Sequence, residues 1–295
     1  MKVLVVGASG FIGRALVDRL LAEGFTVDAW DRRGGAVAPR LRRHAIDLLS
    51  DAPLPAPDGA PWDAVFHLAA HSVLSVPWTS ALVLQNLAMT ARVVEHVATH
   101  ASGCRLILAS SGQVYAASDQ PLTEQSPLAP QHPYGLSKQL CEDWAQSARQ
   151  RLQVQVVRPF NQIGPGMPSG LLIPDVLQRI DTTTGVLAMK GRDDWKDFLD
   201  WRDAIDAYVL LLSTEAASGS VWNLCSGRRT RVSSLIRSIL AERHIEREIR
   251  FADPRVETLL GDPGKLMRST GWAPAHDLQD TVRAICAHPT ANPKS

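Results

Sequence analysis

The sequence predicts an α/β fold in which a doubly wound parallel sheet is joined to a smaller α/β lobe. Over the first 160 residues, short aliphatic and β-branched runs alternate with stretches that are apolar at helical spacing. A glycine-rich turn joins the first run to the first helical stretch. Strands that alternate with helices form a parallel sheet covered on both faces. We therefore expect a sheet domain over residues 1–160 and a smaller lobe over residues 161–295.

The elements of the first domain follow from apolar periodicity. Five short apolar runs predict buried strands, namely Lys2–Val6, Thr26–Trp30, Asp63–Ala70, Arg105–Ala109 and Val154–Phe160. Stretches that are apolar at helical spacing predict helices between them, over Arg14–Gly24, about Thr79–His100 and His132–Arg151.

After Phe160 the pattern becomes shorter and less regular. A glycine/proline loop, Asn161–Gly170, opens this part of the chain, and its clearest helix is Asp203–Ser213. We expect segments within about 195–225 to return to the first domain. Residues 287–295 are expected to form a frayed tail.

Composition and charge argue against several classes of protein. Of 295 residues, 45% are apolar and 21% are charged, and the net charge of +1 gives no footprint for nucleic acid or a membrane surface. The nine histidines and four cysteines form neither HExxH nor CxxC, so we expect no metal site, and the scattered cysteines fit a reducing compartment. The sequence shows neither a signal peptide nor an apolar run of about 18 residues, so a cytoplasmic globular protein is expected.

The glycine turn predicts a binding site for the phosphates of a dinucleotide. Gly7, Gly10 and Gly13 lie between the first strand and its helix, where glycine permits a tight turn and close approach of a pyrophosphate. The helix N-terminus offers free N–H groups there, so Phe11 and Ile12 should also contact the cofactor. The spacing GxxGxxG is a weak signal by itself, but its place in the first β-α-β unit indicates a Rossmann-type domain.

Charged residues after the second strand bear on which cofactor binds. Asp31 ends that strand, where a carboxylate can accept hydrogen bonds from the adenosine ribose. Its charge repels a 2′-phosphate and favours NAD, whereas Arg32 and Arg33 could bind that phosphate and favour NADP. We expect NAD, with NADP as the alternative. Asp47 and Leu48, after the next short strand, are expected beside the adenine.

Tyr134 and Lys138 form a candidate acid/base pair. They lie four residues apart on a predicted helix and so share one face. Proton exchange at neutral pH needs a tyrosine pKa about three units below its usual value, or about 4 kcal/mol. A lysine charge within ~4 Å supplies about that much at an effective dielectric constant near ~20. The pair can therefore form an acid/base tyrosine without a histidine or a metal.

Five motifs in this order resemble those of the extended short-chain dehydrogenase/reductase family acting on nucleotide sugars. They are GASGFIG (7–13), HLAA (67–70), SSGQVY (110–115), YGLSK (134–138) and RPFNQIGPG (158–166), and the resemblance extends over residues 2–283. It implies that Ser111 holds the reacting sugar oxygen, Tyr134 transfers the proton and Lys138 holds the nicotinamide ribose. The further cofactor contacts that it implies are Leu68, Ala69, Ala70, Asn86 and Pro159.

The segment SSGQVY bears on the reaction. The resemblance implies that dehydratases of the family carry Thr-Asp-Glu where this chain has Ser111, Gly112 and Gln113. Removal of water from a sugar ring needs an acid and a base there, but Gly112 has no side chain and Gln113 cannot exchange protons. The sequence therefore argues against dehydration. It favours hydride transfer: ketone reduction, alcohol oxidation, or both in succession, which is epimerisation.

The resemblance also implies contacts to a nucleotide-diphosphate sugar. Asn161 matches a contact to the diphosphate. Lys196 stands where relatives carry a diphosphate-binding arginine, and it keeps the charge but loses the bidentate fork. Arg255 matches another family arginine and is expected to take over more of this contact. The full expected set is His71, Ser111, Gly112, Gln113, Asn161, Leu172, Lys196 and Arg255.

Within the family, the chain most resembles GDP-6-deoxy-4-keto-mannose reductases, in motifs such as RPFNQIGPG and LLGDPGKLMRSTGW. That resemblance implies reduction of the C4 ketone of a nucleotide-linked 6-deoxy sugar. The pattern SSxxVY is equally typical of UDP-hexose 4-epimerases, for which tightly held NAD is expected. A third hypothesis is a non-catalytic dinucleotide sensor of the same fold, and the intact Tyr134 and Lys138 argue against it.

The resemblance implies a homodimer as well. The helices after Thr79 and Tyr134 match the pair that forms a four-helix interface between subunits in relatives. Their apolar residues include Leu84, Leu87, Val93, Val94, Leu140 and Trp144.

Overall fold

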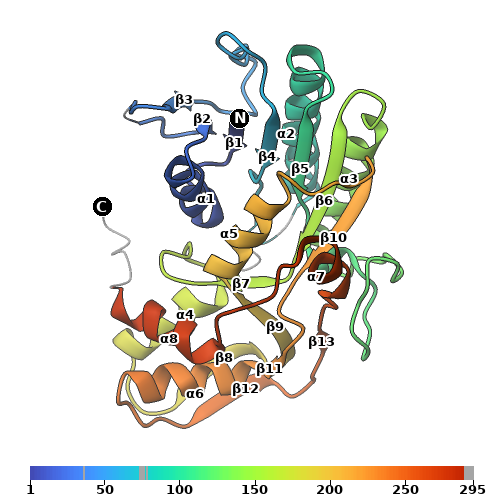
Figure 1. Cartoon of the computed structure of the whole chain (residues 1–295). Coiled ribbons are helices and arrows are strands. Elements are labelled where there is room, and N and C mark those ends of the chain that lie inside the picture. The colour runs from blue at the N-terminus through green and yellow to red at the C-terminus, as the bar shows by residue number, and fades with distance from the viewer. Residues whose placement is uncertain (36, 73–76, 78, 289–295) are drawn as a thin grey trace.

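The computed structural model describes residues 1–35, 37–72, 77 and 79–288, and its centre is a seven-stranded sheet (Figure 1). Neighbouring strands are parallel, in the order β10-β6-β5-β4-β1-β2-β3. They are β1 (Lys2–Val6), β2 (Thr26–Asp31), β3 (Leu41–Ala45), β4 (Ala64–His67), β5 (Arg105–Ala109), β6 (Gln153–Pro159) and β10 (Ser220–Leu224). From β1 the chain adds β2 and β3 on one side of the sheet and β4, β5, β6 and β10 on the other. In such sheets, ligands bind where the strand order reverses, beyond the carboxyl ends of the strands. The predicted doubly wound α/β fold is confirmed.

The side chains of β1 explain why helices cover both faces of the sheet. Val3 and Val5 belong to the core on the side of α1 and α5, whereas Leu4 and Val6 belong to the core on the side of α2 and α3. A strand that is apolar on both faces is stable only between two layers of helices. The helices are α1 (Phe11–Ala22), α2 (Ser80–His100), α3 (Pro133–Ser147) and α5 (Trp201–Leu210).

The second lobe has a core of its own, which includes Ile173, Leu235 and Val282. A small sheet pairs β9 with β11, β13 and β7, and β8 pairs with β12. Strand β10 lies beside β6 in the main sheet although it follows the second-lobe strand β9 in sequence. The remaining elements are β7 (Asn161–Ile163), α4 (Leu172–Thr182), β8 (Leu187–Arg192), β9 (Trp195–Asp200), β11 (Arg229–Arg231), α6 (Val232–Glu242), β12 (Ile249–Asp253), β13 (Thr258–Leu259), α7 (Gly264–Thr270), α8 (Leu278–Ala287) and a short 3-10 helix, η1 (Gly112–Val114).

Several elements end at other residues than the sequence predicts. Strand β4 ends at His67, because the following residues 68–70 leave the strand and line a cavity. Helix α5 begins at Trp201, because the side chain of Asp200 caps it by accepting a hydrogen bond from the N–H of Arg202 (2.7 Å). Residues 289–295 of the predicted tail lie outside the described residues. In the ranges that are described, the helices are too short or too polar for any of them to span a membrane.

Candidate active site

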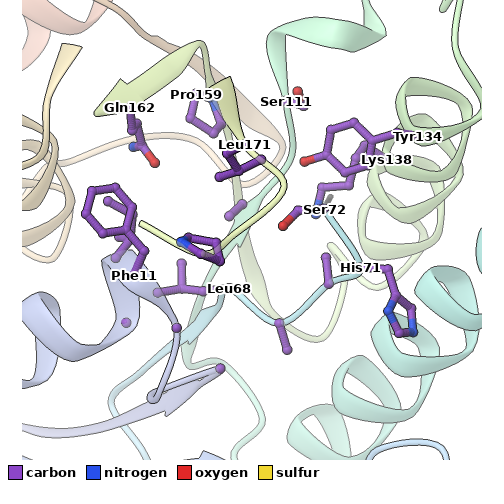
Figure 2. A pocket seen from close by; sticks show the side chains of 18 of the residues that line it. Phe11, Leu68, His71, Ser72, Ser111, Tyr134, Lys138, Pro159, Gln162 and Leu171 are labelled. Atoms are coloured by element: carbon purple, nitrogen blue, oxygen red, sulfur yellow. The ribbon is translucent and has the colours of Figure 1, made fainter. Parts of the chain in front are cut away.

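A cavity of about 590 Å³ opens at the carboxyl ends of the strands, and residues of both the sheet domain and the second lobe line it (Figure 2). Two of the predicted site residues, Asn86 and Arg255, are not on its wall. The predicted residues that line it are Gly7, Gly10, Phe11, Ile12, Gly13, Asp31, Arg32, Asp47, Leu48, Leu68, Ala69, Ala70, His71, Ser111, Gly112, Gln113, Tyr134, Lys138, Pro159, Asn161, Leu172 and Lys196.

Two glycines of the turn are required by close backbone packing, and the turn leads into a helix whose N-terminus is free of caps from the described side chains. Gly7 has φ of +90°, and a Cβ there would lie 2.7 Å from the backbone nitrogen of Ala69. A Cβ on Gly13 would lie 2.1 Å from the carbonyl oxygen of Gly7. Helix α1 begins after Gly10 without an acidic residue in its first turn, and none of the described side chains caps it. Its free N–H groups therefore fit the pyrophosphate of a dinucleotide.

Asp31 lies buried at the end of β2. Its Oδ1 accepts hydrogen bonds from the N–H groups of Arg33 (2.8 Å) and Gly34 (3.0 Å). Its Oδ2 is also buried and lies 3.6 Å from Nη1 of Arg43, but it accepts no hydrogen bond from the described residues. Buried carboxylate oxygens normally have a donor. A ribose hydroxyl would supply one, so Asp31 fits the adenosine end of a dinucleotide.

Asp31→Ala should weaken NAD(H) binding by roughly 10- to 100-fold, which is the effect of losing a hydrogen bond to a charged group. It should favour NADP(H) in relative terms, because the charge that repels a 2′-phosphate is lost while the exposed Arg32 stays on the cavity wall. Dissociation constants of both cofactors, measured by fluorescence titration, test this. Equal affinities for the two cofactors before and after the substitution would remove Asp31 from cofactor selection.

Ser111, Tyr134 and Lys138 come from two elements that meet at the cavity (Figure 2). Ser111 follows β5 and caps η1, where its Oγ accepts a hydrogen bond from the N–H of Gln113 (3.1 Å). Tyr134 and Lys138 lie one turn apart on α3, and the phenol of Tyr134 points into the cavity. The Ser111 side chain lies close enough to the phenol of Tyr134 to act on its pKa. The structure thus brings the three predicted catalytic residues together.

Burial controls the protonation of this pair. It raises the pKa of Tyr134 to about 12, while the Ser111 side chain acts in the opposite direction. Burial also lowers the pKa of Lys138. The nearby Cys141 and Glu142 act to raise this pKa, but their effect is smaller than that of burial. The expectation that Lys138 brings the Tyr134 pKa down is therefore wrong for the residues of this chain alone. Helical spacing can be read from sequence, but the depth of the phenol cannot.

Two residues that the sequence did not single out fix the position of Tyr134. A Cβ on Gly135 would lie 2.2 Å from the carbonyl oxygen of Gln113, so only glycine lets α3 approach the segment after Ser111 this closely. Nδ1 of His132 caps the helix by accepting a hydrogen bond from the N–H of Tyr134 (3.0 Å). Burial lowers the pKa of His132, which keeps this acceptor unprotonated.

Phe160 fills the space beside Gly112. A Cβ on Gly112 would lie 3.1–3.2 Å from three atoms of the Phe160 ring. A side chain at this position would therefore have to displace a buried aromatic ring. The structure agrees with the argument against dehydration, because this position lacks an acid and a side chain there would press against Phe160.

The predicted diphosphate contacts fall into two groups. Lys196 lines the cavity, and its Nζ lies 3.5 Å from Asp194. Asn161 also lines it, and its amide N–H donates to the carbonyl oxygen of Asp197 (2.8 Å). Arg255 has a side chain that is 76% exposed and paired with Asp253 away from the cavity wall. The geometry favours Lys196 as the cation at this end, contrary to the expectation for Arg255.

Asn86 supports the cavity wall from behind. Its Oδ1 accepts from the N–H of His71 (2.7 Å), and its Nδ2 donates to the carbonyl oxygen of His71 (3.1 Å) and to Oγ of Ser137 (3.0 Å). It therefore ties the segment after β4 to the helix that carries Tyr134. Asn86 contributes to the site through His71, which lines the cavity.

Other lining residues carry no signal in the sequence. Many of them are apolar side chains, and in a sequence such residues are read as core. They include Ile163, Met167, Leu171, Ile173, Phe198 and Leu259, and the polar Gln162 and Tyr208 also line the cavity. Within the described residues, no cluster of three or more His, Cys, Asp or Glu side chains could hold a metal ion.

Comparison with known proteins agrees with this geometry. The model of the NAD dependent epimerase/dehydratase family matches residues 3–225. The chain belongs to this family. Two relatives align with almost the whole of this family member. GDP-6-deoxy-D-mannose reductase of Pseudomonas aeruginosa is 31% identical, with 96% of this chain and 95% of that protein covered. UDP-glucose 4-epimerase of Lactobacillus helveticus is 27% identical, with 96% of this chain and 95% of that protein covered.

Two solved structures match the fold over nearly the whole chain. MoeE5 in complex with UDP-glucuronic acid and NAD has a TM-score of 0.87 at 26% identity, covering 97% of this chain and 98% of that one. RMD from Pseudomonas aeruginosa complexed with NADPH has a TM-score of 0.83 at 27% identity, covering 97% of both chains. The expected cavity for a nicotinamide dinucleotide and a sugar nucleotide therefore has parallels in solved complexes.

Proposed function

We propose that this protein is an NAD(P)-dependent reductase of the C4 ketone of a nucleotide-linked 6-deoxy-4-keto sugar. The observation that carries the proposal is the arrangement around Ser111. Its side chain lies beside the phenol of Tyr134, and the next residue, Gly112, carries no acid for dehydration and packs against Phe160. The 31% identity with a GDP-6-deoxy-D-mannose reductase supports the substrate class.

Ser111 and Tyr134 would act as two donors to one oxygen. With its pKa raised to about 12, Tyr134 is a protonated phenol at neutral pH, which is the state that a proton donor needs. Negative charge that develops on the keto oxygen would be met by both hydroxyls in a cleft of low dielectric constant. When bound, the nicotinamide cofactor supplies the hydride. Lys138 would hold its ribose and stabilise the phenolate left on Tyr134.

The sign of the Tyr134 shift predicts the pH profile. A raised pKa extends the protonated form through neutral pH, so reductive turnover should stay flat there and fall only on the alkaline side, about tenfold per unit once the phenol ionises. The reverse oxidation needs the phenolate and should rise with pH. Steady-state kcat in both directions across pH tests this. A reductive kcat that rises with pH through neutrality would exclude Tyr134 as the proton donor.

The second lobe, within residues 161–295, would hold the nucleotide-diphosphate part of the substrate. Lys196 and Asn161 line the cavity on β9 and β7, and these two strands are paired. Contacts far from the reacting carbon supply binding energy that orients the sugar ring at Tyr134. The Lys196 charge is partly offset by Asp194, which would leave a modest net attraction for a diphosphate.

The decisive experiment is incubation with GDP-4-keto-6-deoxymannose and reduced cofactor, following loss of absorbance at the reduced nicotinamide band. We expect stoichiometric oxidation of the cofactor and formation of a GDP-6-deoxyhexose. Absence of oxidation, together with interconversion of a UDP- or GDP-hexose and its C4 epimer, would establish the second candidate, a 4-epimerase.

The epimerase candidate is favoured by one finding, namely the 27% identity with a UDP-glucose 4-epimerase over 96% of this chain. An epimerase must recover its own hydride, so NAD should stay bound through purification. The nucleotide released by denaturing the purified protein separates the two functions. An empty or exchangeable site supports the reductase.

We also propose a homodimer through α2 and α3. Leu84 on α2 and Trp144 on α3 are 60% and 40% exposed, as expected for an apolar surface that another subunit covers. Val93 and Val94, which the sequence placed among the candidates for this interface, are buried in the core and pack inward.

The four free cysteines are consistent with a cytoplasmic setting.

Light scattering at micromolar concentration should give twice the 32.1 kDa mass of one chain. A double variant, Leu84→Glu with Trp144→Glu, should give a monomer because two charges would be buried against a second copy. Val256→Glu is the matched control, since Val256 is also an exposed apolar side chain but lies in the second lobe. A monomeric wild-type protein would defeat the dimer.

A further inference from the structure

We propose that Ser110, Glu142 and Arg158 form a positioning network that holds Ser111 beside Tyr134. None of the three is assigned a role above: Ser110 lies on the cavity wall, whereas Glu142 and Arg158 lie behind it. The proposal rests on the proposed function in one respect, since both use Ser111 and Tyr134 as the reacting pair.

The network joins three elements through buried charges. Ser110 follows β5, Glu142 lies on α3 and Arg158 lies on β6. The three side chains are buried. The Ser110 hydroxyl donates to Oε1 of Glu142. Arg158 donates from Nε to the same oxygen (3.0 Å) and from Nη2 to Oε2 (2.6 Å), so the carboxylate accepts three hydrogen bonds.

The fold dictates this meeting. Ala109 of β5 is opposite Val157 of β6, and the N–H of Ser110 donates to the carbonyl oxygen of Val157 (2.7 Å), so residues 110 and 158 lie next to each other. Glu142 is four residues after Lys138, and therefore lies on the same face of α3 as Lys138 and Tyr134. The network consequently ties the residue before Ser111 to the helix that presents Tyr134.

The far end of the network reaches another strand of the sheet. Nη1 of Arg158 donates to the hydroxyl of Tyr115 (3.0 Å), and that hydroxyl donates to Oδ1 of Asn223 on β10 (2.6 Å). Tyr115 directly follows η1, and Ser111 directly precedes it. The Glu142–Arg158 ion pair is thus hydrogen-bonded to both ends of the segment 110–115, at Ser110 and at Tyr115. Of these two residues, only Ser110 is adjacent to Ser111.

Stability alone does not account for the network. A buried ion pair costs desolvation of both charges, and apolar side chains of the same volume often serve stability as well. A hydrogen bond weakens steeply when its distance or angle changes, so a small shift of Ser111 would uncouple it from Tyr134. Ser110 also lies on the cavity wall, but its hydroxyl donates to Glu142, so we assign it a positioning role that acts through its neighbour Ser111.

The test compares two variants, Ser110→Ala and the matched control Tyr115→Phe. Each removes one hydroxyl that is hydrogen-bonded to the Glu142–Arg158 ion pair. Ser110→Ala should lower kcat about tenfold, as misplacement of a reacting group does, while KM and the cofactor dissociation constant stay within about twofold. Tyr115→Phe should keep kcat within about twofold of wild type, even if its thermal unfolding midpoint falls as much as that of Ser110→Ala, or more. A merely structural role of Ser110 would not produce this separation of kcat from KM and from stability.

Two results would overturn the proposal: a Ser110→Ala variant with kcat within about twofold of wild type, or equal losses of kcat in the two variants. The kcat of each variant relative to wild type is measured on GDP-4-keto-6-deoxymannose, or on a UDP-hexose if the wild-type protein proves to be an epimerase. Failure of the proposed function then shows in the wild-type protein, whereas failure of the positioning network shows only in the variants.

Discussion

Tyr134→Phe should lower turnover by roughly two to four decades while leaving cofactor binding nearly intact, because the ring remains and only the proton donor is lost. Ser111 would still hold the keto oxygen, but the alkoxide formed by hydride transfer would have no acid beside it. The measurement is kcat on the true substrate together with the dissociation constant of the reduced cofactor. A variant with near-normal turnover would remove Tyr134 from the mechanism.

A matched control for this substitution is Tyr208→Phe. Tyr208 is also a buried tyrosine on the cavity wall, but it belongs to α5 and packs among the core residues shared with α1. Loss of its hydroxyl should leave kcat within about tenfold, since it is not placed as a proton donor. Similar losses in both variants would mean that the cavity depends on its phenols for shape rather than on Tyr134 for proton transfer.

The candidate catalytic residues could be named from sequence because helical spacing pairs Tyr134 with Lys138 and the family resemblance adds Ser111. Ser111 follows a strand end, and Tyr134 and Lys138 share a helix face, so the parallel sheet itself places them at one edge. The glycine turn is equally local, since Gly7 and Gly13 are required by backbone contacts within one β-α unit and its neighbouring strand.

The parts that could not be predicted depend on contacts between distant segments. Arg255 has the charge for a diphosphate, but pairing with Asp253 holds it outside the cavity, whereas Lys196 on β9 faces inward. The pKa of Tyr134 depends on how deeply α3 packs, which the spacing of two residues does not reveal. The contact between Gly112 and Phe160 joins residues 48 positions apart, and it appears only when β6 lies beside β5.

Gly135→Ala should abolish most activity and destabilise the protein, although helix propensity alone predicts the opposite. Alanine is favoured over glycine inside a helix by about 1 kcal/mol. Here, however, the added Cβ would lie 2.2 Å from the carbonyl oxygen of Gln113, and a backbone oxygen cannot rotate away as a side chain would. Either α3 or the segment after Ser111 must move, and both movements separate Tyr134 from Ser111.

We expect a net loss of about 1–3 kcal/mol in the free energy of unfolding from the clash and a fall in kcat of at least about a hundredfold. Urea unfolding and steady-state kinetics measure the two effects. Gly191→Ala is the matched control, because a Cβ at Gly191 in β8 meets none of the described atoms within 4 Å and should leave both quantities unchanged. A Gly135→Ala protein with wild-type turnover and higher stability would show that the close approach of α3 to the catalytic segment is not required.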